Sequence, residues 1–303
     1  MKWKKILFEI AKILITLILL YLLFRKLNFT ELKETFIHIR ILYFILGVLM
    51  YLFGIFISSF RWNLFLRHLG FNYNTLSLFS HYLKSLFLAN FLPSGGLDVA
   101  RLMFLGKDRI KEKLSSTFMD RVFGFLAINI YVFLGLLYSL KDTGRYATLI
   151  IVFLILQLLF FFLLFSKKAA VIFTLLKRLP MGEHLFHIYE ILHSFRKKSI
   201  ITKAILYSFI IQLSYSLDVY FIVLSVRKNI GLLRSILFVP FINFITMIPV
   251  TVSGFGLREG GFVFLFKNYI GKEAAIASSL LYYISIFVVS VTGGILLLRF
   301  KSK

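Results

Sequence analysis

Residues 41–60 read ILYFILGVLMYLFGIFISSF and contain no charged side chain. A helix of this length spans about 30 Å, which matches the hydrocarbon core of a bilayer. Comparable apolar stretches lie at 6–24, 117–140, 146–166, 204–226 and 274–298. The 303 residues are 59% hydrophobic and 16% charged, whereas soluble domains are about half apolar and about a quarter charged. The composition excludes a soluble enzyme and predicts an all-α integral membrane protein with about six full transmembrane helices.

Two further apolar stretches, 75–106 and 235–268, are interrupted by helix-breaking residues. The first break contains Pro93, Ser94, Gly95 and Gly96, and the second contains Pro249, Ser253, Gly254 and Gly256. Proline lacks an N–H and glycine weakens a helix, so neither stretch is expected to cross the membrane as one straight helix. We predict that each forms a re-entrant hairpin that enters the membrane and returns on the same side.

The order of these segments predicts an inverted repeat within a single transmembrane domain, residues 1–303. A first helix at 6–24 precedes a first repeat at 41–140, and 146–203 supplies a connecting helix and a basic loop before the inverted second repeat at 204–298. Secondary transporters often use opposed repeats with broken helices in matching positions, and their site lies where the breaks meet.

The excess of positive charge indicates how the chain is oriented. Lys and Arg number 36 against 13 Asp and Glu, giving a net charge of +23, and the basic residues lie between apolar runs. That arrangement is typical of cytoplasmic loops of a multi-pass cell-membrane protein, and no nucleic-acid-binding motif is present. With both hairpins re-entrant and the N-terminus inside, 20 basic residues face the cytoplasm and 11 face outward. We therefore predict that the N- and C-termini are both cytoplasmic.

Acidic and basic residues at membrane depth are the candidate site residues, because charges there are costly. Asp98 and Arg101 follow the first break, Arg258 and Glu259 follow the second, and Asp120 with Arg121 begins a span. A helix start after a glycine-rich break offers free N–H groups, and arginine offers a planar fork for phosphate oxygens. We expect these residues to bind an anionic headgroup between two facing breaks, with Asp120 and Arg121 in support. A fourth acid, Asp218, has no basic neighbour in sequence.

The basic loop 167–203 carries His184, His187 and Glu190 three residues apart. Three such groups on one helical face could hold a metal, but a polar stripe is the more usual meaning of this pattern. The loop itself is either an amphipathic segment on the inner leaflet or a solvated linker. The chain contains no cysteine, which excludes disulfides and Cys-liganded zinc. We predict no metal, no cofactor and no catalytic residue.

Several motifs resemble the lysylphosphatidylglycerol synthase transmembrane-region family, a flippase-like family of multi-pass membrane proteins. The early signature is NFLPSGGLDVAR at 90–101 with DRVFG at 120–124, and the late one is PVTVSGFGLREG at 249–260. The stretch SFRW at 59–62 is also similar. The resemblance extends over nearly the whole chain.

The resemblance implies a lipid translocase. In fused members of the family this region moves an aminoacylated phospholipid to the outer leaflet, and a separate soluble domain makes that lipid. The present sequence ends at Lys303 after its last span, so lysyl transfer is not expected of this chain alone. It departs from the family in having Asp98 where glutamate is common and Tyr282-Tyr283 where an arginine is often found. A glycolipid or polyprenyl-linked lipid is therefore another candidate substrate.

Three functions fit the sequence. The first is a flippase for an anionic or aminoacylated phospholipid, with membrane lipids and a separate lipid-modifying enzyme as its partners. The second is an integral-membrane enzyme that modifies lipid headgroups, or a subunit of a phosphatidylglycerol lysyltransferase system. Only His81 and Lys84 lie near the first hairpin as acid–base candidates for it. The third is a small-solute transporter of the same inverted-repeat plan. The oligomeric state is not specified by the sequence.

Overall fold

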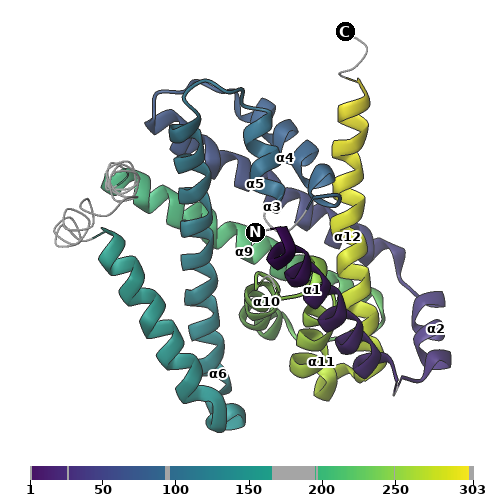
Figure 1. Cartoon of the computed structure of the whole chain (residues 1–303). Helices are drawn as coiled ribbons and strands as arrows, with labels where there is room; N and C mark the ends of the chain where they lie inside the picture. Colours follow the sequence, from purple (N-terminus) through teal and green to yellow (C-terminus); the bar gives the residue numbers. More distant parts are fainter. Residues whose placement is uncertain are drawn as a thin grey trace.

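The computed structural model describes residues 2–25, 27–92, 96–165, 195, 197–248 and 250–299, and every regular element in these ranges is a helix (Figure 1). In chain order they are α1 (Lys2–Phe24), α2 (Phe29–Ile37), α3 (Ile41–His68), α4 (Thr75–Ala89), α5 (Gly96–Met103), α6 (Ile110–Phe165), α9 (Lys198–Ser225), α10 (Leu232–Thr246), the short 3-10 helix η1 (Val252–Gly254), α11 (Leu257–Ile270) and α12 (Lys272–Arg299). The all-helical prediction is thus confirmed for the described residues.

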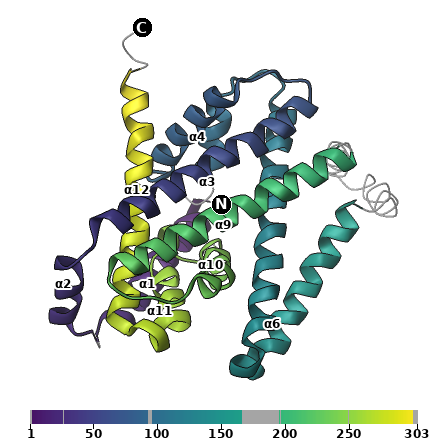
Figure 2. The ribbon, with the colours of Figure 1, turned by 180° about the vertical axis from the view of Figure 1, so that it is seen from behind.

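Within the described residues, four helices are long and apolar enough to cross a membrane. They are Ile41–His68, Ile110–Tyr138, Lys198–Ser225 and Lys272–Leu298. A fifth candidate is the pair Ala11–Phe24 and Phe29–Ile37, which is bent by 90°. The described residues therefore supply four or five spans where the sequence predicted about six. The remaining predicted span, 146–166, coincides with the last part of α6, which turns back beside its first part in Figures 1 and 2.

One face of α3 shows how the sequence fits a lipid environment. Ile41, Ile45, Leu49 and Phe53 recur every four residues and are all exposed. The opposite side buries Tyr51, together with the polar residues considered below. Since i and i+4 positions share a helix face, this is a continuous apolar stripe with no protein partner in the described structure, as expected of a surface that faces acyl chains.

Both predicted interruptions are present. α4 ends at Ala89 and α5 begins at Gly96, while α10 ends at Thr246 and α11 begins at Leu257. In the second break Ser253, Gly254 and Gly256 have φ of 50°, 76° and 84°. Glycine adopts such values freely and serine rarely does, so the predicted hinge residues redirect the chain here. Pro93, Ser94, Gly95 and Pro249 lie outside the described residues, as do His184, His187 and Glu190.

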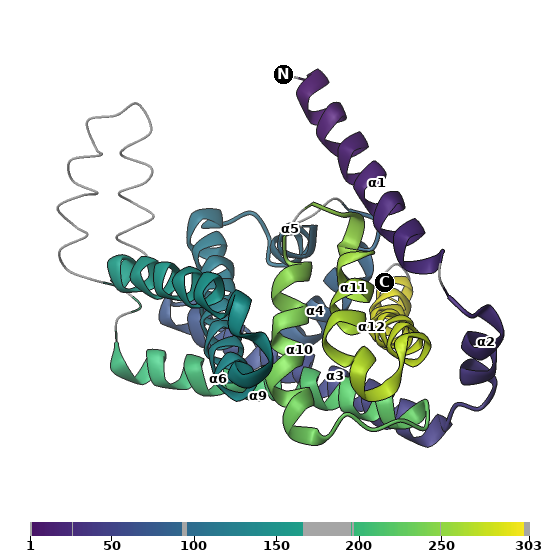
Figure 3. The same ribbon diagram turned by 90° about the horizontal axis from the view of Figure 1, so that it is seen from below.

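The helices pack in a crossed arrangement around α3 and α9, which lie side by side along much of their length (Figures 2 and 3). α4 packs against α12, and α10 packs against α6. α11 packs against α12 as well, so α4 before the first break and α11 after the second break share α12 as a partner. α1 leans out of the bundle in Figure 3 and contacts α11 and η1. This packing brings the two distant breaks together.

Candidate functional site

A cavity of about 440 Å³ lies where the two helix breaks meet. Its lining includes Leu97, Asp98 and Arg101 after the first break and Thr251 and Gly254 in the second. Residues of α3, α4, α6, α9, α10 and α12 also belong to the lining. A site at the meeting point of the breaks was predicted from their matching positions in the sequence. The volume lies in the range of small-molecule sites, about 300–1,000 Å³.

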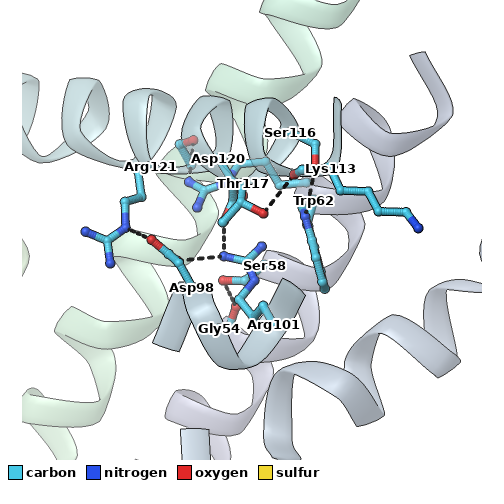
Figure 4. A network of polar contacts seen from close by, with 12 residues as sticks. Gly54, Ser58, Trp62, Asp98, Arg101, Lys113, Ser116, Thr117, Asp120 and Arg121 are labelled. Carbon is cyan, nitrogen blue, oxygen red and sulfur yellow. Dashed lines mark hydrogen bonds and ion pairs between the residues drawn. The ribbon is translucent and has the colours of Figure 1, made fainter. Parts of the chain in front are cut away.

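The charged residues of the cavity lining, which we call the charged wall, are Arg61, Asp98, Arg101, Asp120 and Arg121. Asp120 on α6 binds two of the arginines. Arg101 of α5 donates a hydrogen bond from Nη1 to Asp120 Oδ2 at 3.0 Å (Figure 4). Arg61 of α3 donates from Nε to Asp120 Oδ1 at 2.7 Å. All three side chains are buried. One carboxylate therefore joins three helices that are far apart in sequence. Arg61 also donates from Nη1 to the Ser208 hydroxyl of α9 at 2.8 Å.

Arg101 contacts two aromatic rings that are nearly perpendicular to each other, at an interplanar angle of 88°. The carbon at the centre of its guanidinium lies 4.1 Å from the ring centroid of Trp62 and 4.4 Å from that of Tyr82. These cation–π contacts hold the planar cation in place. Two of its nitrogens, Nε and Nη2, are buried and have no hydrogen-bond partner among the described residues. A buried donor without a partner is costly, and an anion in the cavity would satisfy it.

Asp98 joins this group from the opposite side. It forms an ion pair with Arg101 at 3.6 Å, three residues along α5, and a second ion pair with Arg121 of α6. Asp98 and Arg101 are three residues apart and therefore share one face of α5. Asp120 and Arg121 point to different faces of α6, because Asp120 meets Arg101 while Arg121 meets Asp98 (Figure 4).

The charges on this wall do not cancel. Three guanidiniums, of Arg61, Arg101 and Arg121, face two carboxylates, of Asp98 and Asp120. One positive charge is therefore in excess next to the partly apolar cavity. Electrostatic interactions are stronger in such surroundings than in water. The wall is consequently suited to a singly charged anion.

A second contact set fixes the connection between α5 and α6. Lys113 donates from Nζ to the carbonyl of Leu105 and to Asp108 Oδ1, both at 2.7 Å. This hydrogen bond lowers the pKa of the Asp108 carboxyl, which lies in the loop outside the spans. One turn along α6, the Ser116 hydroxyl accepts a hydrogen bond from the Trp62 indole at 3.3 Å. These contacts set the position of α5, and hence of Arg101, relative to Asp120.

Arg258 and Glu259 are placed differently from the other candidates. Glu259 is buried and accepts hydrogen bonds from the Gly256 N–H at 2.6 Å and from Arg258 Nη2 at 3.2 Å. Arg258 lies over the rings of Phe255 and Tyr283. Neither residue is part of the cavity lining described above. The pair closes the start of α11, and it does not face Arg101 across the cavity as the sequence suggested.

Several lining residues were not among the predicted site residues. Arg61 entered the sequence analysis only through its resemblance to the family motif, although it shares Asp120 with Arg101. The aromatic lining residues Tyr51, Tyr82, Tyr215 and Tyr282 come from four helices. Tyrosine is frequent in this chain, with 15 copies. Composition therefore gave no signal that separates these four from the rest.

Comparison with known proteins agrees with this architecture. The family model for the lysylphosphatidylglycerol synthase TM region matches residues 10–294. A UPF0104 membrane protein of Pyrococcus horikoshii is 24% identical over 291 residues, covering 85% of this chain and 87% of that protein. No solved structure matches. Since the match includes both breaks and every residue of the charged wall, the chain belongs to the lysylphosphatidylglycerol synthase TM region family of multi-pass membrane proteins.

Proposed function

We propose that this protein moves an anionic phospholipid between the leaflets of the cell membrane, with the headgroup passing through the cavity and the acyl chains remaining in lipid. The observation that carries the proposal is Arg101, whose buried Nε and Nη2 lack partners in the described structure while its ring contacts hold it in place. A phosphodiester offers oxygens for both nitrogens in one plane. The excess positive charge of the wall favours a single negative charge.

The size and lining of the cavity support a headgroup as its occupant. A volume of about 440 Å³ accommodates a glycerophosphate group and not a complete diacyl lipid. Tyr51, Tyr82 and Tyr282 contribute aromatic surface beside the charged wall. Tyrosine pairs an apolar ring with a polar hydroxyl, which suits the boundary between a headgroup and its acyl chains.

We also propose that the two halves form an inverted repeat, and the helix contacts support this. α6, the last helix of the first half, packs on α10 of the second half. α12, the last helix of the second half, packs on α4 of the first half. A Cβ on Gly135 of α6 would lie 2.8 Å from the Leu237 carbonyl oxygen of α10. Gly293 of α12 makes the corresponding close approach to the Leu83 carbonyl of α4. Opposed repeats allow a central site to open alternately to each side.

Orientation and partners follow from the same proposal. The termini are cytoplasmic because that arrangement places more of the basic loops inside. A separate lipid-modifying enzyme supplies the substrate if the lipid carries an aminoacyl group. The orientation can be checked with two variants that carry a single cysteine, at Glu34 or at Lys107. The proposed topology places these two positions on opposite sides of the membrane, so a reagent added outside intact cells should label only one of them.

The direct test is lipid exchange in reconstituted vesicles. Purified protein is placed in liposomes that contain fluorescent phosphatidylglycerol, and the fraction protected from dithionite is followed over time. We expect exchange in the wild type and a strong reduction in Arg101→Ala. Arg109→Ala is the matched control, because Arg109 also stacks on a ring, Phe71 at 4.4 Å, but lies outside the cavity lining. Equal exchange in all three proteins would contradict the proposal, and mass spectrometry of the lipids would reveal an enzymatic product instead.

A further inference from the structure

Asp218 is a buried acid that the charged wall does not use. It lies on α9, and its side chain is fully buried. Oδ2 accepts a hydrogen bond from the Ser285 hydroxyl of α12 at 2.9 Å, and Oδ1 has no hydrogen-bond partner among the described residues. Asp120, by contrast, binds two guanidiniums. An ionised carboxylate without a cation is very costly in such surroundings, so the environment of Asp218 favours the protonated acid.

Asp218 lies one helical turn behind the aromatic lining of the cavity. Three tyrosines of that lining belong to three different helices, namely Tyr51, Tyr215 and Tyr282. Asp218 follows Tyr215 by three residues on α9, and its partner Ser285 follows Tyr282 by three residues on α12. Positions three or four apart share a helix face and are about 5 Å apart along the axis. Asp218 therefore lies about one turn of α9 beyond Tyr215, whose ring stacks on that of Tyr51 with centroids 5.1 Å apart.

The titratable side chains nearest Asp218 on the helices packed around it are tyrosines, whose phenols are ordinarily neutral at physiological pH. They are Tyr215 on its own helix, Tyr51 from α3 and Tyr282 from α12. From α10, the Ser235 hydroxyl donates to the Ser216 carbonyl of α9 at 2.6 Å, whereas the hydroxyl that binds Asp218 is that of Ser285. α6 and α10 present no Lys, Arg or His in ion-pair contact with Asp218 in the described ranges. A change in the charge of Asp218 would thus be uncompensated.

The space around the carboxyl group favours a proton over a metal cation. A Cβ on Gly47 of α3 would lie 2.8 Å from Asp218 Oδ1, so this oxygen occupies the space left by the missing side chain. Na⁺ or Ca²⁺ would need several oxygen ligands arranged around it. The described contacts supply one hydroxyl, that of Ser285. A proton needs no coordination shell and can be bound here.

We propose that Asp218 is a proton-binding site that couples headgroup movement to a proton gradient. When the cavity is open to one side, the Asp218 carboxylate takes a proton from water and becomes the neutral acid. When the cavity opens to the other side, the acid returns the proton to water there. A singly anionic headgroup that moves with one proton carries no net charge. This inference rests on the lipid transport proposed above.

The test uses the full-length protein in vesicles with fluorescent phosphatidylglycerol and an imposed pH difference. For electroneutral coupling of one proton to one lipid, a difference of one pH unit enriches the lipid about tenfold in the leaflet on the alkaline side. We expect this enrichment in the wild type and none in Asp218→Asn, which resembles the neutral acid in shape. Glu34→Gln, which changes an exposed acid on α2, is the matched control and retains the enrichment.

The outcomes separate this inference from the function on which it rests. Enrichment that is lost in Asp218→Asn, with exchange in the absence of a gradient retained, supports proton coupling. A wild type that exchanges lipid but ignores the gradient overturns the coupling and leaves the transport proposal intact. Equal enrichment in Asp218→Asn overturns the assignment to this residue. A wild type that exchanges no lipid overturns the transport proposal and this inference with it.

Infrared difference spectroscopy gives a readout that is independent of transport. Raising the pH of the wild-type protein should diminish a carbonyl band of a protonated carboxylic acid, and this band should be absent from Asp218→Asn. Asp218→Glu, which keeps a titratable group, should retain such a band at a shifted position. An identical pH-dependent band in the wild type and in Asp218→Asn would overturn the proposal.

Discussion

Arg101 and Asp120 form a buried ion pair at 3.0 Å, although they belong to different helices and are separated by 19 residues. The Asp120 carboxylate binds Arg61 through its other oxygen. Two guanidiniums thus depend on one carboxylate for their buried position. This arrangement fixes α3, α5 and α6 around the cavity and determines where an anion can bind.

Replacing Asp120 with asparagine should therefore destabilise the protein strongly. Asparagine keeps the shape but leaves Arg61 and Arg101 without this counter-charge, and breaking a buried pair in this way costs about 3–5 kcal/mol. Thermal unfolding in detergent measures the effect. Glu34→Gln removes an exposed acid and should leave the melting temperature nearly unchanged. Similar melting temperatures for the two variants would show that the Asp120 network contributes little to stability.

The substitution Arg101→Lys tests whether the planar fork matters beyond its charge. Lysine keeps the positive charge but loses the contacts of the planar guanidinium with the Trp62 and Tyr82 rings, and it cannot present two parallel donors. We expect headgroup affinity to fall by roughly tenfold, since hydrogen bonds to charged groups contribute about 1.5–3 kcal/mol each. Binding of short-chain phosphatidylglycerol, measured by calorimetry, checks this. Arg109→Lys is the control, and equal affinity in both variants would contradict a directional role for Arg101.

The close crossing of α12 and α4 predicts a large difference between two glycine substitutions. A Cβ on Gly293 would overlap the backbone of α4 at Leu83, and backbone cannot move aside as a flexible side chain can. Gly293→Ala should destabilise the protein by about 1–3 kcal/mol because of this overpacking.

Gly260 on α11 is the matched control for that crossing, because a Cβ there meets nothing within 4 Å. Gly260→Ala should stabilise its helix by roughly 0.5–1 kcal/mol through the better helix propensity of alanine. Thermal unfolding of both variants tests the pair. A Gly293→Ala protein at least as stable as Gly260→Ala would contradict the observed crossing.

The sequence predicted the elements of the fold better than their contacts. The span at 41–60 and the breaks after Ala89 and Thr246 follow from hydropathy and from residues that cannot continue a helix. The pairing of Asp98 with Arg101 follows from helical spacing alone. Hydropathy, helix breaking and helical spacing each depend on a few neighbouring residues, so they can be read without knowing how the helices pack.

Contacts between helices that are far apart in sequence cannot be predicted from these local patterns. Arg61 precedes Asp120 by 59 residues, and no local pattern indicates that they share an ion pair. Arg258 resembles Arg101 in sequence because both follow a break beside an acid. Arg258 instead lies over the rings of Phe255 and Tyr283, outside the cavity lining. Only the packing of α11 against α12 distinguishes the two arginines.

The final prediction concerns Arg258 and Glu259, which the structure places at the start of α11 and away from the cavity lining. Glu259→Ala removes the acceptor of the Gly256 N–H and leaves the Arg258 guanidinium buried without its carboxylate, so it should lose about 3–5 kcal/mol of stability. Adding Arg258→Ala removes the uncompensated charge and should restore part of that loss, with a coupling energy of about 0.5–3 kcal/mol between the two sites.

Lipid exchange per folded molecule should change far less in Arg258→Ala than in Arg101→Ala, because Arg101 lines the cavity and Arg258 does not. Unfolding and exchange assays on the three variants measure both quantities. If Arg258→Ala abolished exchange while leaving stability intact, the headgroup would have to reach the second break as well, and the cavity would extend beyond the wall formed by Arg61, Arg101 and Arg121.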